Sequence, residues 1–349
     1  MTTYPTKALT GASHLLPSLF HRYRKYVERS LRSALDDGKS GLYQMLRYHI
    51  GLADGPVLQG KAVRPVLCLF ASEASGGKWQ NAMPAAVALE LAHNFSLIHD
   101  DIQDGDIERR HRPTLWYLWG TPKALAAGNA MWAMADLALL KLAGYGVRSE
   151  VVLRASGVMT EGCLEMILGQ HLDLSFEGRL DITVNDYMDM ISKKTGALMD
   201  VSSRLGALIG NADPDTVSAF GRCGRLLGLV FQIRDDILGI WGDTKNTGKP
   251  MGNDIRKRKM TLPVVYTLEH ASQATRKEIG RLFQKETLAE EEVTRIIAAM
   301  ESVNAQRYSR ILAKQKCSQA LRAMGDISMQ PWARKELEEL SSFLLTREN

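Results

Sequence analysis

Apolar residues recur with helical spacing along almost the whole chain. Between residues 79 and 99, large apolar side chains stand four positions apart, at Met83, Val87, Leu91 and Phe95. This spacing puts them on one side of a long helix. The same pattern predicts helices over residues 122–143, 148–172, 183–210 and 214–241, separated by Gly and Pro signals. An alternating β pattern persists nowhere for more than a few residues, so the sequence predicts an all-α protein.

The composition agrees with this prediction. Hydrophobic residues make up 45% of the 349 residues, enough for one large core, and aromatic residues only 7%. Leu, Ala and Met supply most of the apolar mass, and their side chains lose little freedom in a helix. We expect a single domain, residues 1–349, built as a bundle of about a dozen helices with short connections. The more charged region 264–349 is expected to supply outer scaffold helices.

The charge and the cysteines narrow the class of protein. The formal net charge is +5, and the densest basic run, residues 256–259, is short. An anionic small substrate explains such a cluster, so we expect no nucleic-acid partner. The four cysteines have no C-x-x-C pair, which favours buried free thiols in a reducing compartment.

The amino-terminal region is polar and shows no signal peptide. The longest apolar stretches fall far short of the ~20 residues that a membrane-spanning helix needs. We therefore expect a soluble, cytoplasmic protein with no integral membrane segment. The basic segment 21–26 could bind a membrane surface, but a solvated helix is the favoured interpretation.

A first acidic cluster, Asp100, Asp101 and Asp104, ends the long apolar helix. Asp100 and Asp104 are four residues apart, so their carboxylates share one face and repel each other. Magnesium suits such a pair, because it takes one or two carboxylates and completes its shell with water and phosphate oxygens. A solvated acidic helix end is the alternative. Arg109 and Arg110 follow closely and could bind a phosphate by forked hydrogen bonds.

A second acidic pair, Asp235 and Asp236, lies late in another apolar helix. Two aspartates in apolar surroundings are costly to leave unpaired. One such pair could form a structural ion pair with Arg234 or Arg225. Two acidic groups on two long apolar helices are better explained by one shared cation cluster.

These two regions resemble the D-D-x-x-D motifs of the trans-isoprenyl diphosphate synthases, and the resemblance extends from about Gly60 to Pro263. Further motifs of that family occur in the expected order: G-K-x-x-R-P at 60–65, R-R-x-x-P-T at 109–114 with His111 in place of glycine, G-Q at 169–170, K-T-G at 194–196, and the lysines Lys249 and Lys259. Together these motifs are far more specific than any one of them. The resemblance implies the isoprenoid synthase fold, with helices around a central substrate cavity.

Two positions depart from the family pattern. Gly239 stands where the last aspartate of the second motif is usual. Asp243, two turns beyond Asp235, could replace it if the helix continues past Gly242. Asn129 stands where relatives often carry aspartate, and we assign it no role.

The resemblance also implies a reaction: head-to-tail condensation of isopentenyl diphosphate with an allylic diphosphate. About three magnesium ions would be held by the metal-binding residues Asp100, Asp101, Asp104, Asp235 and Asp236. The allylic diphosphate would be bound by Arg109, Lys194 and Lys259, and isopentenyl diphosphate by Lys61, Arg64, His93 and Arg110. Lys249 would be a further substrate-binding residue. Thr195 and Gln232 would stabilise the allylic cation, and together with Lys194 and Arg109 they form the implied catalytic group. No protein general base is implied, and a homodimer is.

Product length is expected to depend on Phe95 and Ser96. Phe95 lies five and Ser96 four positions before Asp100, so they sit ~7.5 and ~6 Å deeper along the helix. One aromatic and one small residue here resemble the C20, geranylgeranyl-forming pattern, with C15 the second choice.

Two alternatives remain open. A class I terpene cyclase shares the fold and the metal chemistry but needs one diphosphate pocket, whereas this chain keeps residues for a second. A non-catalytic subunit of a prenyl synthase would be expected to have lost aspartates or arginines, and this chain retains nearly all.

Overall fold

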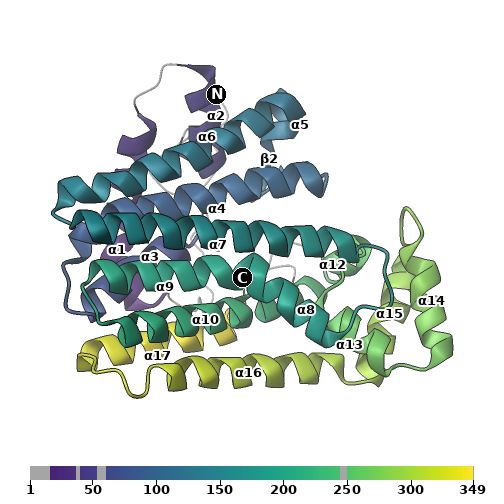
Figure 1. The fold of residues 1–349 in the computed structure, drawn as a ribbon. Coiled ribbons are helices and arrows are strands. Elements are labelled where there is room, and N and C mark those ends of the chain that lie inside the picture. The colour runs from purple at the N-terminus through teal and green to yellow at the C-terminus, as the bar shows by residue number, and fades with distance from the viewer. Residues whose placement is uncertain (1–15, 37–39, 53–59, 244–249, 349) are drawn as a thin grey trace, which may run out of the picture.

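The computed structural model describes residues 16–36, 40–52, 60–243 and 250–348. Long helices lie side by side: from the top of the view come α6, α4, α7, α9 and α10, while α16 and α17 run along the side away from α6 (Figure 1). The shorter helices α12 to α15 gather at one end. The α-helices are α1 Ser18–Leu35, α2 Gly41–Ile50, α3 Val63–Ala74, α4 Met83–Gln103, α5 Leu115–Trp119, α6 Thr121–Leu140, α7 Ser149–Phe176, α8 Val184–Ile191, α9 Ala197–Ile209, α10 Pro214–Trp241, α12 Asn253–Arg256, α13 Leu262–His270, α14 Gln273–Phe283, α15 Glu290–Ser302, α16 Ala305–Ala323 and α17 Pro331–Thr346.

The ends of α10 show why the sequence predicts this helix at its full length. Asp213 is the N-cap, and its side chain accepts hydrogen bonds from the Asp215 and Thr216 N–H groups. Pro214 follows at the first helical position, where a missing N–H costs nothing. At the other end Gly242 is extended, with φ −67° and ψ 141°, so the helix stops after Trp241.

The region predicted as one helix over residues 183–210 is divided. Thr183 and Asp186 form a capping box that starts α8. A π-helical turn, η3 (Ser192–Gly196), then separates α8 from α9. A π turn inserts one extra residue without changing the direction of the helix, so hydrophobic periodicity does not reveal it.

The β-structure within the described residues is a two-stranded hairpin, β1 (Glu108–Arg109) with β2 (Arg112–Pro113). Arg110 and His111 form its turn, with φ 53° and 61°. Positive φ at both central residues is the geometry of a tight hairpin turn, which glycine adopts most easily. His111, the residue that replaces the family glycine, holds this conformation.

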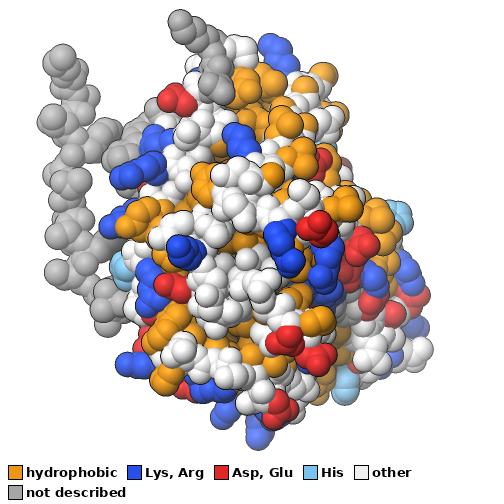
Figure 2. Space-filling model, turned by 60° about the vertical axis from the view of Figure 1, so that its left-hand side comes forward, with side chains coloured by type: hydrophobic (Ala, Val, Ile, Leu, Met, Phe, Trp, Pro, Cys, Tyr) orange, Lys and Arg blue, Asp and Glu red, His pale blue; other side chains and the backbone are white. Residues whose placement is uncertain are grey.

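Two apolar cores share α10. The larger core involves α1, α3, α4, α6 and α9, and the smaller one involves α8, α13, α15 and the second half of α10. Among the described helices, none is both long enough and apolar enough to cross a membrane. On the face shown in Figure 2, basic and acidic side chains are interspersed with bands of apolar ones.

Candidate active site

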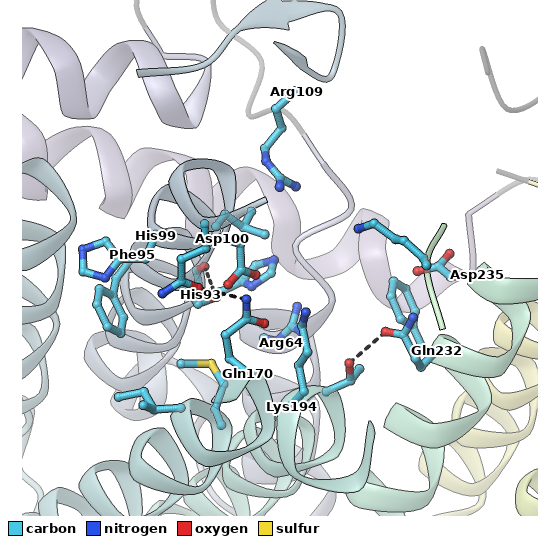
Figure 3. Close-up of a pocket in the computed structure, with 18 of the residues that line it drawn as sticks. Arg64, His93, Phe95, His99, Asp100, Arg109, Gln170, Lys194, Gln232 and Asp235 are labelled. Carbon is cyan, nitrogen blue, oxygen red and sulfur yellow. Dashed lines mark hydrogen bonds between the residues drawn. The ribbon is translucent and has the colours of Figure 1, made fainter. Parts of the chain in front are cut away.

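A cavity of about 480 Å³ lies between α3, α4, α7, η3 and α10. Most of the site residues predicted from the sequence line it (Figure 3): Arg64, His93, Phe95, Ser96, Asp100, Arg109, Arg110, Lys194, Thr195, Gln232, Asp235 and Lys259. Phe95 and His99 lie at one end of the close-up, and Gln232 and Asp235 at the other. Lys61, Asp101, Asp104 and Asp236 are not part of this lining, and Lys249 lies outside the described residues.

Asp100 faces the cavity near Lys194. Burial raises the pKa of the Asp100 carboxyl, and Asp104 adds to the rise, while Lys194 and Arg109 oppose it. Burial alone would lower the pKa of Lys194, but Asp173 and Asp100 raise it, so the ammonium keeps its proton. The Lys194 Nζ lies 2.5 Å from Asp173 Oδ2. Asp173, which the sequence analysis did not name, therefore holds Lys194 in place.

Asp104 lies on the adjoining side of α4, next to Lys259. The Lys259 Nζ is 3.2 Å from Asp104 Oδ2. Both residues line a second, polar hollow at the mouth of the site, where Lys257 also pairs with Asp106. The loop before α13 is thus tied to the end of α4 by two ion pairs.

Asp101 points away from the cavity and is 2% exposed. Its Oδ1 accepts a 2.6 Å hydrogen bond from the Arg109 Nε. Burial raises the pKa of Asp101 to about 6, although Arg109 opposes the rise. This geometry favours a role in orienting Arg109, and a metal-binding role for Asp101 stays a prediction.

The two adjacent aspartates of α10 have different surroundings. Asp235 lines the cavity, whereas Asp236 is buried and accepts hydrogen bonds from the Tyr187 hydroxyl, the Leu262 N–H at 3.0 Å and the Gln232 Nε2 at 3.1 Å. Burial raises the pKa of Asp236 to about 7, although these hydrogen bonds oppose it. The Gln232 Oε1 in turn accepts from the Thr195 hydroxyl at 2.9 Å. Asp236 thus orients Gln232, which favours Asp235 as the metal ligand of the pair.

The counter-ion of Asp235 comes from the end of the chain. Neither Arg225 nor Arg234 supplies it; Arg347, which follows α17 and is 4% exposed, pairs with Asp235. The Arg347 Nη2 also donates to the Phe231 carbonyl at 3.1 Å, and the Arg347 carbonyl accepts from the Arg234 Nε at 2.7 Å. The expectation of outer scaffold helices after residue 263 therefore missed a residue that reaches the site.

The place of the missing aspartate at Gly239 is filled by another carboxylate. A Cβ atom at Gly239 would overlap the side chain of Asp254 on α12. The suggested substitute, Asp243, is excluded from this face because α10 ends at Trp241 and Gly242 is extended. Asp254 restores acidic charge near the second cluster from a different helix.

A group of basic side chains, Arg64, His93 and Arg110, forms what we call the basic pocket. Burial lowers the pKa of Arg64 to about 10, and burial together with the neighbouring arginines holds the pKa of His93 well below its ordinary value. The buried Arg64 Nε has no hydrogen-bond partner among the described residues. Surplus positive charge and an unpartnered donor fit an anionic ligand such as a diphosphate.

Lys61 lies beside Phe343 and close to the charges of Arg347 and Asp235. Its ammonium is 5.6 Å from the centre of the Phe343 ring. Burial lowers its pKa to about 8, and Arg347 adds to this effect. Glu90, buried one turn before His93, supplies negative charge to Arg64 and Arg110: both arginines oppose the rise in its pKa that burial causes.

The apolar end of the cavity is closed by aromatic rings. Phe95 makes an edge contact with His99 at 4.8 Å between ring centres and a tilted contact with Trp132 on α6 at 5.8 Å. The Ser96 hydroxyl donates back to the His93 carbonyl at 2.8 Å. Trp132 was not identified from the sequence, because its contact with Phe95 joins two helices. Asn129, given no role, is exposed.

We give the name acidic side to three carboxylates, Asp100, Asp104 and Asp235. Their arrangement suits a magnesium ion that is shared with a substrate phosphate, and does not form a complete metal cage. Among the described residues no three acidic, histidine or cysteine side chains converge closely enough to hold an ion by themselves. Magnesium commonly binds through one or two carboxylates together with substrate phosphates. These carboxylates lie beside a cavity of about 480 Å³, and burial raises the pKa of Asp100, so the site matches that chemistry.

The fold and the site together define an all-helical protein with acidic and basic side chains lining one cavity, an arrangement suited to a diphosphate substrate. Comparison with known proteins agrees. The sequence pattern of the polyprenyl synthetases matches residues 42–300. The chain is 37% identical over 330 residues to the (2E,6E)-farnesyl diphosphate synthase of Mycobacterium tuberculosis, covering 92% of this chain and 90% of that protein.

A second relative and a solved structure support the same assignment. The geranylgeranyl diphosphate synthase of Mycobacterium tuberculosis is 37% identical over 338 residues, covering 95% of this chain and 94% of the relative. The crystal structure of a polyprenyl synthetase from Streptomyces coelicolor superposes with a TM-score of 0.87 at 35% identity, covering 94% of this chain and 99% of the other. The chain belongs to the polyprenyl synthetase family, with the isoprenoid synthase fold, and is a prenyltransferase.

Proposed function

We propose that the protein condenses isopentenyl diphosphate head-to-tail with an allylic diphosphate, in a magnesium-dependent reaction, to give a short-chain prenyl diphosphate. One observation supports this most strongly: the basic pocket and the acidic side are built from different residues, yet both line the same cavity. A terpene cyclase needs only one diphosphate site, and a non-catalytic subunit needs neither. The basic pocket therefore favours the chain-elongating transferase.

The acidic side would hold magnesium, about three ions by family resemblance, and these ions would neutralise charge on the allylic diphosphate. Arg109, Lys194 and Lys259 bind the same diphosphate from the protein side and stabilise it as a leaving group. The Thr195 hydroxyl and the Gln232 amide, linked at 2.9 Å, offer dipoles to the allylic cation and no strong nucleophile to trap it. Arg64, His93 and Arg110, with Lys61 beside them, hold isopentenyl diphosphate.

The product is proposed to be C20, with C15 as the second choice. Phe95 closes the cavity against His99 and Trp132, and the relatives include both farnesyl and geranylgeranyl diphosphate synthases. Phe95→Ala should lengthen the product by removing the ring that stops chain growth. Mass spectrometry of the products measures this, with Leu91→Ala, a buried residue of the same helix outside the cavity lining, as the control. An unchanged product distribution would exclude Phe95 as the floor.

We also propose a homodimer. Large apolar side chains are exposed along α5, α6 and α7, including Tyr117, Leu118, Leu125, Leu137, Leu140, Leu153, Leu164, Ile167 and Leu168. A helix that is apolar on all sides is normally covered on all sides. Analytical ultracentrifugation measures this directly, and a monomer at micromolar concentration would contradict the proposal.

The central experiment is incubation with isopentenyl diphosphate and each allylic starter (C5, C10 and C15), with and without magnesium. We expect prenyl diphosphates that appear only with magnesium, and their masses give chain length and starter preference. A cyclised hydrocarbon formed from geranylgeranyl diphosphate alone would favour the cyclase. The absence of any magnesium-dependent product from all three starters would refute the proposed function.

A further inference from the structure

The π turn η3 carries two of the catalytic side chains, Lys194 and Thr195. The extra residue of a π turn rotates the side chains that follow it by about 100° about the helix axis. Lys194 reaches Asp173 on one side and Thr195 reaches Gln232 on the other. Lys194 and Thr195 therefore point into the cavity only if the π turn forms at these residues and not elsewhere in the helix.

Two neighbouring helices approach the π turn through glycines. A Cβ atom at Gly169 of α7 would overlap the backbone nitrogen of Lys194. A Cβ atom at Gly228 of α10 would lie 2.9 Å from the Gly196 Cα. The turn is thus confined by close backbone contact on two sides. These contacts limit space but do not select one hydrogen-bonding register.

Arg225 of α10 supplies a directional contact on the remaining side. Its two terminal nitrogens donate to Glu165 of α7 at 2.6 and 2.8 Å, a forked pair. Its Nε and Nη2 donate to Asp200 of α9 at 3.1 and 3.0 Å. Its Nη1 also lies 3.4 Å from both the carbonyl and the hydroxyl oxygen of Ser192, the first residue of the turn.

A contribution to folding stability does not by itself explain the contacts of Arg225 with Glu165, Asp200 and Ser192. Asp200 is almost fully buried, and burying ions costs hydration energy that well-packed apolar side chains would not cost. A forked guanidinium does, however, fix distances and angles between three helices. The Arg225 guanidinium links α7 to α9 through Glu165 and Asp200. This link lies next to the π turn, which precedes α9.

We propose that Arg225 is a positioning residue that fixes the π turn at Ser192–Gly196 and thereby aims Lys194 and Thr195 into the cavity. Arg225 does not line the cavity and takes no part in the chemistry. The inference rests on the proposed function for its catalytic consequence. Its structural part, the order of the turn, is independent of any reaction.

Arg204 offers a matched control. It also pairs with Asp200, with its Nε 2.9 Å from Asp200 Oδ1, and its side chain is 40% exposed against 28% for Arg225. Its described contacts with carboxylates end at Asp200 and do not include Glu165 or Ser192. Arg204→Met removes a cation from the same carboxylate without removing the contact with the turn.

The first test is amide hydrogen exchange followed by mass spectrometry on Arg225→Met, Arg204→Met and the unchanged protein. We expect exchange in residues 192–197 to become about tenfold faster or more in Arg225→Met, and to stay within about twofold in Arg204→Met. Equal protection of this segment in both variants would overturn the proposal. If Arg225→Met does not fold, Arg225→Lys keeps the charge without the fork, and wild-type protection in that variant would overturn it equally.

The second test is kinetic. A small misplacement of catalytic groups can cost about 10²-fold in rate, so kcat should fall by about 10- to 100-fold in Arg225→Met. The KM for isopentenyl diphosphate should change by less than about threefold, because the basic pocket is built from other elements. A rise in this KM with unchanged kcat would contradict the assigned role. If the unchanged protein makes no product, the proposed function fails, while the exchange test still decides on Arg225.

Discussion

The acidic side and the basic pocket differ in how their charges are balanced within the protein. Around the acidic side the charges are paired: Asp235 with Arg347, Asp104 with Lys259, and Lys194 with Asp173. In the basic pocket the Arg64 Nε lacks a hydrogen-bond partner among the described residues, and the pKa values of Arg64 and His93 are lowered. The basic pocket is therefore preorganised for an anion, whereas the acidic side must exchange partners when its ligands bind.

The largest expected effect comes from removing a carboxylate of the acidic side. Asp100→Asn should lower kcat/KM by about 10²–10³-fold, because charge that develops on the leaving diphosphate is no longer balanced. Incorporation of labelled isopentenyl diphosphate measures the rate, and calorimetric titration measures magnesium affinity. Asp236→Asn is the comparison: it should lower the melting temperature and leave magnesium affinity nearly unchanged. A greater loss of magnesium affinity in Asp236→Asn than in Asp235→Asn would reverse the roles given to these neighbours.

A change in the basic pocket should act on binding instead. Arg110→Met should raise the KM for isopentenyl diphosphate by about 10–100-fold, since hydrogen bonds to charged groups contribute about 1.5–3 kcal/mol. The KM for the allylic substrate should change by less than about threefold. Arg112→Met is the control, because Arg112 lies outside the cavity with its guanidinium 4.0 Å from the Tyr48 ring centre. Equal effects on both substrates would show that the two sites are not separate.

Restoring the family aspartate at position 239 should harm the protein. In Gly239→Asp the new side chain meets Asp254, and we expect the free energy of unfolding to fall by about 1–3 kcal/mol through overpacking. The double variant Gly239→Asp/Asp254→Ala should recover most of this loss, which urea denaturation measures as a coupling energy. Additive effects would mean that Asp254 does not occupy the vacant position.

The smallest effect concerns pH. Burial and the charges of Arg109, Arg110 and Arg112 lower the pKa of His49, beside the basic pocket, to about 3. Because the folded-state pKa lies below the unfolded value near 6.5, His49 stabilises the fold above that pH and the contribution is lost as pH falls. Between pH 6.5 and 5.5 stability should fall by up to about 1 kcal/mol more in the unchanged protein than in His49→Gln. Identical urea denaturation midpoints at both pH values would contradict this.

Short local motifs predicted many of the residues that line the cavity. Residues that pair over long sequence separations could not be predicted in this way. The spacing of Asp100 and Asp104 already implies a shared face, and Lys194 belongs to a short family motif. Arg347 pairs with an aspartate 112 positions away, and no local pattern signals such a contact. Asp173 could have been found, because it lies three residues after Gln170 on the same helix.

The same limit applies to the fold. Helical periodicity predicted the length of α10 because its caps, Asp213 and Gly242, are visible in the sequence. It could not reveal the π turn within residues 183–210, since the chain continues in the same direction as a helix on both sides of the turn. The contact of Gly239 with Asp254 depends on how α12 returns to α10, which only tertiary structure specifies.

The ion pairs around the acidic side have a consequence for the order of ligand binding. A metal ion that arrives alone must separate Asp235 from Arg347, and a diphosphate that arrives alone must draw Lys194 from Asp173. When both arrive together, each released protein charge finds a new partner of opposite sign. Magnesium and the allylic diphosphate should therefore bind synergistically, and the affinity measured for either one alone should be weaker than its affinity in the ternary complex.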